Sequence, residues 1–224
     1  MRTHYTLREV SKKFAKEYHD CPACSQTSDE KIIREIEDIV RETLGNDPVH
    51  GFPHIERVMK IAFKIAEDYT GKFDPLVLKL AILLHDIGRV EEQDLHKHHA
   101  ILSAEIAENI LEQYGFPKII IEKVKDAILA HSFTLGYKPK TIEGIILSDA
   151  DKLDALGAVG IMRVFMESAY RGRTLDEAIS HFYEKLFKLK DLMRTSKGKE
   201  IAIKRHSYMI RFLDKLEREI EGLE

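Results

Sequence analysis

Apolar residues spaced three or four positions apart recur along almost the whole chain of 224 residues, and this pattern most constrains the fold. It is the periodicity of amphipathic helices, whereas sustained alternation of apolar and polar residues, which marks half-buried strands, does not occur. Capping residues, glycines and prolines divide the pattern into segments. We expect helices at about 29–44, 53–69, 75–88, 98–114, 117–131, 142–171, from 174 onward and 197–223. The sequence therefore predicts an all-α fold.

Domain organisation follows from the length of the chain and from the way it is interrupted. A chain of 224 residues suits one domain with a sizeable core. No internal repeat, low-complexity tract or linker divides it, although Gly144, Gly157 and Gly160 predict a break within the segment 142–171. We expect a single-domain helical bundle over 29–224, preceded by a loosely packed N-terminal extension over 1–28.

Composition and charge exclude several classes of function. With 35 basic and 38 acidic residues the formal net charge is −3, which argues against a protein that coats nucleic acid or an anionic membrane. No apolar run is long enough to span a bilayer and no signal-peptide core follows Met1, so we expect a cytoplasmic protein. Charged residues make up 33% of the chain while Asn and Gln are scarce, which favours a thermophilic source. Two cysteines, Cys21 and Cys24, are too few for a disulfide framework. We expect an incidental pair, or a disulfide tolerated in a thermophile, rather than half of a zinc site.

Histidine is unusually frequent, with 11 residues, and several of them fall on apolar helix faces. His54, His99 and His131 each share a helix face with apolar residues three, four or seven positions away. The pair His85-Asp86 ends a segment that is apolar almost all round, which is typical of a buried central helix. An ionised carboxylate in such a place is costly unless a cation meets it. We therefore expect these side chains in the interior.

Three aspartates, Asp149, Asp151 and Asp154, lie within another largely apolar helix. Such charges repel one another and need a cation or hydrogen-bond donors nearby. Inward histidines and aspartates on separate helices are what a metal site inside a helical bundle requires. Imidazole together with carboxylate suits a divalent ion such as Mn, Fe, Co, Ni, Zn or Mg. The alternative, that each residue is an independent hydrogen-bonding group of the core, is less favoured.

At this point the sequence resembles a known family. The ordered set His54, His85-Asp86 and Asp151 resembles the H…HD…D signature of the HD-domain metal-dependent phosphohydrolases. The segments 50–58 and 148–158 resemble those of its small, stand-alone bacterial and archaeal members, and the similarity extends over about 29–213. The resemblance implies the all-α HD bundle, with His54, His85, Asp86 and Asp151 as metal ligands.

The same resemblance bears on two further histidines. His99 and His131 occupy the places where dinuclear members of the superfamily add two more ligands. They are expected either to hold a second metal ion or to contact substrate phosphate.

The expected activity is hydrolysis of a phosphoester or phosphoanhydride bond in a nucleotide or similar small phosphate compound. A divalent ion held by two His and two Asp keeps positions for water and for a phosphate oxygen, and lowers the pKa of the water. The resemblance leaves open a nucleoside-triphosphate pyrophosphohydrolase, and a non-catalytic nucleotide sensor is the alternative. We expect neither a nucleic-acid polymer nor a membrane as partner.

Residues near the expected ligands receive supporting roles. Arg57 and Lys152 are candidates for contacts with substrate phosphate, with surface ion pairs as the equal alternative. Asp149 is a candidate for orienting a ligand histidine. The acidic residues after the third helix either supply a general base or form a solvated loop: Glu91, Glu92 and Asp94.

The remaining histidines receive no role in the predicted site. His206 shares a helix face with the apolar stripe of the segment 197–223, which comprises Ile203, Ile210, Leu213 and Leu216. Such a stripe usually packs in the core, and a homodimer seam is the alternative. The loop residue His50 is not assigned. The histidines expected at the periphery are His4, His19, His96, His98 and His181.

Overall fold

The computed structural model describes residues 25–223, and in that range the chain consists of helices joined by turns and loops, with no strand. The all-α prediction is confirmed. Cys21 and Cys24 lie outside the described residues, and so does most of the predicted extension 1–28. The helices are α2 (Ser25–Leu44), α3 (Phe52–Ala66), η1 (Glu67–Tyr69), α4 (Pro75–Leu84), η2 (Ile87–Glu91), α5 (Glu92–Leu95), α6 (His99–Gln113), α7 (Lys118–His131), α8 (Ile142–Asp154), α9 (Gly157–Tyr170), α10 (Leu175–Glu184), η3 (Leu186–Leu192) and α11 (Ser196–Ile220).

Helix α4 lies at the centre of a bundle formed by α2 to α8, which we call the main bundle. It contacts α2, α3, α6, α7 and α8. Its side chains are apolar on every face, and those from Val77 to Leu84 are buried, apart from that of Lys79. A helix without a polar face is stable only where neighbours cover all of it, so the sequence of α4 dictates its central place.

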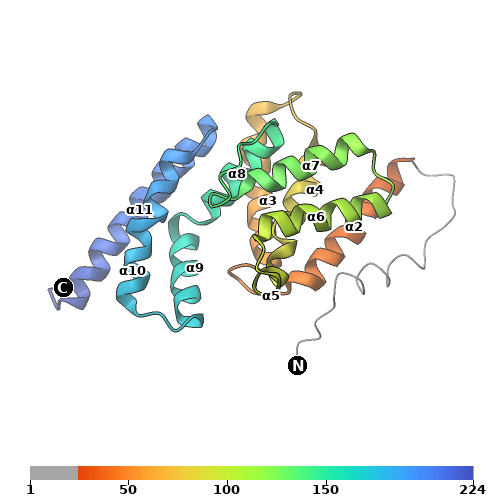
Figure 1. Ribbon diagram of the computed structural model, residues 1–224. Helices are drawn as coiled ribbons and strands as arrows, with labels where there is room; N and C mark the ends of the chain where they lie inside the picture. Colours follow the sequence, from red (N-terminus) through yellow and green to blue (C-terminus); the bar gives the residue numbers. More distant parts are fainter. Residues whose placement is uncertain (1–24, 224) are drawn as a thin grey trace.

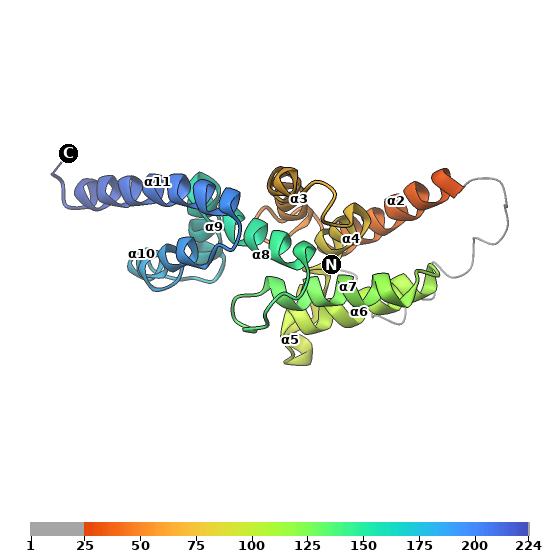
Figure 2. The same cartoon turned by 90° about the horizontal axis from the view of Figure 1, so that it is seen from above.

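Helices α9, α10 and α11 form a second group beside the main bundle, which we call the C-terminal lobe. Figure 1 shows the lobe on one side and the main bundle on the other, with α8 between them. The view in Figure 2 shows the same separation, and α8 contacts both α9 and α11. The predicted break in the segment 142–171 is the junction between α8 and α9, where Gly157 has a positive φ of 76°.

Side-chain caps explain where several helices begin. The carboxylate of Asp74 accepts hydrogen bonds from the backbone of Leu76 and Val77 at the start of α4. Thr141 and Thr195 cap α8 and α11 in the same way. At α10 the Thr174–Glu177 capping box that the sequence predicted is present in full.

The third helix ends earlier than predicted. We expected it to run to Gly88, but α4 stops at Leu84 and the short helix η2 follows. Gly88 does not end this helix but allows a close contact with α6. A Cβ at this position would lie 2.6 Å from Leu102 Cβ and 2.6 Å from the Ser103 backbone nitrogen. Glycine therefore lets η2 pack directly on α6, and the sequence pattern could not show that contact.

The apolar stripe predicted for the last helix is divided. Leu213 is buried as expected, but Ile203 and Ile210 are 61% and 46% exposed. Helix α11 turns the face with Ala202 and Met209 inward instead. The homodimer alternative stays a prediction. Among the described residues, no helix combines the length and the apolar character needed to cross a membrane.

Candidate metal centre

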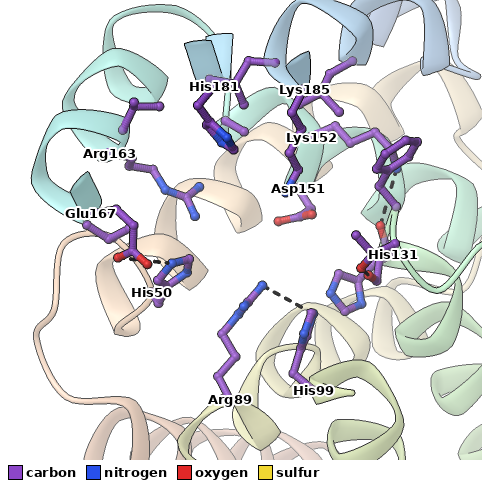
Figure 3. Close-up of a pocket in the computed structure, with 18 of the residues that line it drawn as sticks. His50, Arg89, His99, His131, Asp151, Lys152, Arg163, Glu167, His181 and Lys185 are labelled. Atoms are coloured by element: carbon purple, nitrogen blue, oxygen red, sulfur yellow. Dashed lines mark hydrogen bonds and ion pairs between the residues drawn. The ribbon is translucent and has the colours of Figure 1, made fainter. Parts of the chain in front are cut away.

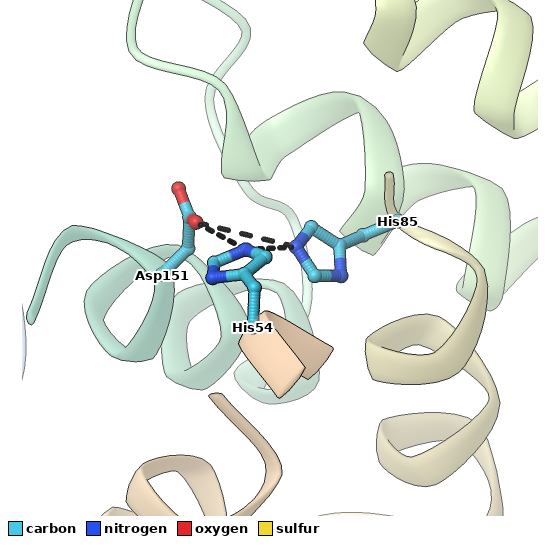
Figure 4. Close-up of side chains that lie close together, drawn as sticks. All are labelled: His54, His85 and Asp151. Carbon is cyan, nitrogen blue, oxygen red and sulfur yellow. Dashed lines mark hydrogen bonds and ion pairs between the residues drawn. The ribbon is translucent and has the colours of Figure 1, made fainter. Parts of the chain in front are cut away.

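Six side chains from five segments meet where α3, α4, α6, α7 and α8 come together. They are His54 in the first turn of α3, His85 and Asp86 directly after α4, His99 at the start of α6, His131 at the end of α7, and Asp151 in α8. His54, His85, Asp86 and His131 are at most 1% exposed. Figure 4 shows His54, His85 and Asp151 pointing toward one another. The structure thus brings together all the residues predicted as ligands.

One ring nitrogen of each buried histidine is occupied by an acceptor outside the cluster. His85 Nδ1 lies 2.7 Å from the Ile82 carbonyl oxygen, and His131 Nδ1 lies 2.5 Å from the Ile128 carbonyl oxygen. A carbonyl oxygen only accepts, so each Nδ1 donates its proton. A neutral imidazole has one donor and one acceptor nitrogen, so Nε2 of each ring carries a free lone pair. Both lone pairs face the cluster.

The distances between the facing atoms suit a bound cation. His54 Nε2 lies 3.3 Å from His85 Nε2, 3.4 Å from Asp151 Oδ1 and 3.6 Å from Asp86 Oδ2. Ligand atoms about 2.1 Å from one ion are separated from each other by about 3.0–3.4 Å. Without a cation or a proton between them, two imidazole lone pairs at this distance would repel. His54, His85 and Asp151 form one such donor group.

A second donor group adjoins the first and shares His85 with it. It consists of His85, Asp86 and His131. Asp86 Oδ1 lies 3.5 Å from His131 Nε2 and 3.8 Å from His99 Nε2. Asp86 Oδ1 and His131 Nε2 are buried atoms without a hydrogen-bond partner among the described residues. Because buried polar atoms are rarely left unpaired, these two atoms fit a site for a cation.

The ionisation states of Asp86, His85 and His99 are compatible with metal binding. Although burial alone would raise the pKa of Asp86, Arg89, His85 and His131 hold it well below its usual range. Burial lowers the pKa of His85 to about 4, and burial together with Arg89 lowers that of His99 to about 4. At neutral pH the carboxylate is charged and these two rings are neutral, as metal binding requires.

His54 differs from the other rings. Burial alone would lower its pKa, but hydrogen bonds with Asp151 and Asp154 outweigh burial and raise the pKa. The pKa of Asp151 is lowered, because the bond from His54 and the nearby histidines outweigh the effect of burial. A proton on His54 Nε2 would occupy the place that a cation between His54 and Asp151 would take.

The cluster opens into a pocket of about 460 Å³ between the main bundle and the C-terminal lobe (Figure 3). Its wall carries six basic side chains, which are Arg89, Lys152, Arg163, Arg171, Arg173 and Lys185. Three arginines are paired, Arg89 with Asp86, Arg163 with Asp154 and Arg171 with Glu167. Within residues 25–223, Arg173 and Lys185 form no ion pair. The pocket therefore offers an anion positive charge beside the metal-ligand cluster.

The two cations predicted to contact phosphate have different surroundings. Lys152 lines the pocket, but its Nζ donates to the Ser148 hydroxyl at 2.5 Å and lies 3.4 Å from the His131 carbonyl oxygen. Arg57 is absent from the pocket wall, and its Nε donates to Asp154 Oδ1 at 2.7 Å.

Asp149 and Asp154 also differ in their partners. Asp149, predicted to orient a ligand histidine, accepts hydrogen bonds from the backbone of Arg194 and Thr195 and from the Thr195 hydroxyl. The outer nitrogen of His54, a predicted ligand, is contacted instead by Asp154, whose Oδ2 lies 2.8 Å from His54 Nδ1. Helical spacing could have indicated this, because Asp154 is three residues after Asp151 and shares its face, whereas Asp149 does not.

Several pocket residues were missed or placed elsewhere from the sequence. His181 and His98, expected at the periphery, line the pocket, and so does His50. His98 also caps α6, and its ring stacks on that of His99 with the ring centroids 4.4 Å apart. Glu92, one of the acidic residues after the third helix, lies 3.1 Å from His99 Nδ1. The Asp94 side chain lies outside the described residues.

Several known proteins resemble this chain in sequence and in fold. The profile of a family described as "HD domain" matches residues 51–156. The protein YpgQ of Bacillus subtilis (strain 168) is 37% identical over 183 residues, which are 78% of this chain and 86% of YpgQ. The crystal structure of Bacillus subtilis YpgQ in complex with ADP has a TM-score of 0.71 at 32% identity, and the match covers 88% of this chain and 98% of that chain.

Two other relatives show how far the similarity extends. The crystal structure of an HD-superfamily hydrolase from Bacillus thuringiensis has a TM-score of 0.68 at 32% identity, covering 86% of this chain and 98% of that chain. Ribonuclease Y of Borreliella afzelii (strain PKo) is 32% identical over 129 residues, which are 57% of this chain but 21% of that protein. The similarity to ribonuclease Y is thus confined to a small part of the larger protein.

Proposed function

The chain belongs to the HD domain family, and from this premise we propose that it is a metal-dependent phosphohydrolase. Its substrate is a nucleotide or a similar small phosphate compound, in which it cleaves a phosphoester or phosphoanhydride bond with a metal-activated water. The observation that carries the proposal is the convergence of imidazole Nε2 atoms and carboxylates at a pocket with a cationic wall. This combination provides both a metal site and a place for the phosphate.

In this proposal His54, His85, Asp86 and Asp151 hold a divalent ion, which is Mn, Co, Ni, Fe, Zn or Mg. When bound, such an ion polarises phosphate oxygens and lowers the pKa of a water molecule toward neutrality. His131 and His99 either hold a second ion together with Asp86 or contact the phosphate. The unpaired buried atoms Asp86 Oδ1 and His131 Nε2 favour the second ion.

The chain's own cations bind and orient the phosphate groups. Two ligand carboxylates neutralise one divalent ion formally, so a polyanionic substrate needs further positive charge. Lys152, Arg163 and Lys185 line the pocket and could supply that charge near the cluster. Arg57 is bound by Asp154 and does not line the pocket, so we propose no direct phosphate contact for it.

A nucleotide is the favoured substrate because the structure of the relative YpgQ was determined in complex with ADP. Nucleoside-triphosphate pyrophosphohydrolysis is the more specific candidate. Arg173 and Lys185 favour it, since neither forms an ion pair within residues 25–223 and a long phosphate chain would reach beyond the metal ligands to such charges. A non-catalytic nucleotide sensor is the alternative.

The test is a hydrolysis assay of the purified protein with Mn²⁺, Co²⁺, Ni²⁺ or Mg²⁺. Substrates are nucleoside mono-, di- and triphosphates, with single-stranded RNA as a separate arm, and both phosphate and pyrophosphate are measured. Release of either product from a nucleotide with at least one metal supports the proposal. No release with any metal contradicts it, and tight nucleotide binding without turnover would indicate the sensor instead.

A pair of variants tests the metal site itself. Asp86→Ala should abolish both stoichiometric metal binding and hydrolysis while the far-UV circular dichroism spectrum stays helical. Asp126→Ala is the matched control, since Asp126 is also buried but accepts its hydrogen bonds from Tyr137 and the Lys140 backbone. Metal retained by Asp86→Ala at the level of the control would refute the ligand assignment.

A further inference from the structure

We propose that Asp154 is a positioning residue: held in place by Arg57 and Arg163, its carboxylate fixes the His54 ring with Nδ1 protonated and Nε2 facing the metal site. The inference rests on the metal site of the proposed function and is independent of the reaction catalysed there. It concerns residues for which the family signature assigns no role here.

The contacts of Asp154 leave its carboxylate no freedom. Asp154 is 1% exposed and ends helix α8. Its Oδ2 accepts hydrogen bonds from His54 Nδ1 at 2.8 Å, Arg163 Nη1 at 2.7 Å and Arg57 Nη2 at 2.9 Å. Its Oδ1 accepts one from Arg57 Nε at 2.7 Å. Four donor contacts, three at Oδ2 and one at Oδ1, therefore hold the carboxylate in one orientation.

The donor residues come from two helices, α3 and α9, and among them only His54 can change its protonation state. Arg57 lies on α3, one turn after His54, and its Nη2 also donates to the Pro48 carbonyl oxygen at 3.1 Å. Arg163 lies on α9 and crosses to Asp154 from the C-terminal lobe. Neither guanidinium loses a proton in a protein, so both remain donors. The orientation of the carboxylate is therefore set by the arginines, and His54 adapts to it.

The state of His54 decides whether the ring can be a ligand. With the proton on Nδ1, the Nε2 lone pair faces His85 and Asp86 at 3.3 Å and 3.6 Å. With the proton on Nε2, an N–H group would occupy the same place and exclude a cation. Carboxylates that hold the outer nitrogen of a ligand histidine are a general means of selecting the first form.

Asp154→Asn should reverse this preference. The two arginines would compete for the single amide oxygen, and the amide N–H group would turn toward His54 Nδ1. That nitrogen must then accept, so the proton moves to Nε2. In serine proteases, an Asp is hydrogen-bonded to Nδ1 of the catalytic histidine. Replacing that Asp with Asn leaves the geometry of the site intact but gives the histidine the wrong tautomer.

The experiment compares wild type, Asp154→Asn and the control Asp126→Asn. Mn²⁺ affinity is measured by isothermal titration calorimetry, and we expect Asp154→Asn to bind about 10–100-fold more weakly, the usual effect of losing such a partner. Asp126→Asn should bind like wild type. The second measurement is the tautomer of His54 in the metal-free proteins, read from long-range ¹H–¹⁵N spectra at alkaline pH, where the ring is neutral.

The outcomes separate this inference from the proposed function. Wild-type affinity in Asp154→Asn, or a wild-type spectrum with the proton on Nε2, overturns the role of Asp154. If wild type bound no divalent ion at all, the proposed function would fail, while the spectrum would still decide the tautomer. Should Asp154→Asn not fold, the wild-type spectrum alone decides, with Nδ1 protonation as the expected result.

Discussion

Each ring in the cluster has its outer nitrogen engaged, and this detail determines the chemistry of the inner one. His85 and His131 donate from Nδ1 to the carbonyl oxygen three residues earlier, at the ends of α4 and α7. The last carbonyls of a helix lack partners within the helix. One hydrogen bond thus completes the helix end and orients the ring, so both histidines are placed by the helices that carry them.

The lowered pKa values of His85 and His99 predict acid sensitivity of the metal-free protein. Their pKa values are about 4 in the folded state, mainly because of burial, against 6.5 when exposed. Between pH 4 and pH 6.5 the unfolded chain therefore binds more protons, so the free energy of unfolding decreases as the pH falls through this range. His54, whose pKa is raised, has the opposite effect at higher pH.

Thermal unfolding in the presence of a chelator, followed by circular dichroism from pH 4 to pH 8, measures this effect. We expect the melting temperature to fall steadily below pH 6.5. In His85→Gln the fall should be shallower, because one of the depressed groups is absent. A melting temperature independent of pH between 4 and 6.5 would contradict the neutral state of these rings.

At the scale of elements, a close backbone contact brings two of the predicted site residues, Asp86 and His99, together. Helix η2 follows Asp86, contains Arg89 and packs on α6, which carries His99. The contact depends on Gly88, whose backbone nitrogen also donates to the Ser103 hydroxyl at 2.9 Å. Because Gly88 has no side chain, the backbone of η2 packs directly against α6. This contact fixes the separation between Asp86, which precedes η2, and His99 on α6.

Gly88→Ala tests this contact. The new Cβ would lie 2.6 Å from Leu102 Cβ, so η2 must move away from α6. Overpacking of this kind costs about 1–3 kcal/mol of stability. We expect a lower free energy of unfolding in urea and a weaker affinity for Mn²⁺, because Asp86 and His99 move apart. Unchanged metal affinity would show that the two ligands do not depend on this contact.

Asp149 connects the main bundle to the C-terminal lobe. Its carboxylate accepts bonds from Arg194 and Thr195 before α11, and a Cβ on Gly198 would lie 2.6 Å from its Oδ2. Asp149→Asn places an N–H group against these donors and leaves one of them unpaired. We expect a loss of about 1–3 kcal/mol in the free energy of unfolding, measured by urea denaturation. A loss below the error of the method would contradict this anchoring role.

The sequence predicted the parts of the site that depend on one helix at a time. His54, His99 and His131 lie on apolar faces, and a helix buries its apolar face, so their convergence followed from register. Asp154 and Arg163 belong to a contact between helices from different parts of the molecule. Periodicity within one helix carries no information about which groups meet across such a contact.

At the scale of the whole molecule, the main bundle and the C-terminal lobe contribute different residues to the pocket. The predicted metal ligands come from the main bundle, whereas Arg163, Arg173, His181 and Lys185 come from the C-terminal lobe. A phosphate chain that contacts both the proposed metal site and these side chains would connect the main bundle to the C-terminal lobe. A metal ion alone would connect only helices of the main bundle.

Hydrogen exchange measured by mass spectrometry can distinguish the two kinds of binding. Mn²⁺ alone should slow backbone exchange in α3 and α8, because their ligands become linked by the ion. Adding the non-hydrolysable anion imidodiphosphate should in addition slow exchange in α10, since Lys185 directly follows that helix. Lys185→Gln should weaken this additional protection. Lys188→Gln is the control, because Lys188 is exposed and does not line the pocket. Protection of α10 by Mn²⁺ alone, or none with imidodiphosphate, would show that the lobe takes no part in binding the anion.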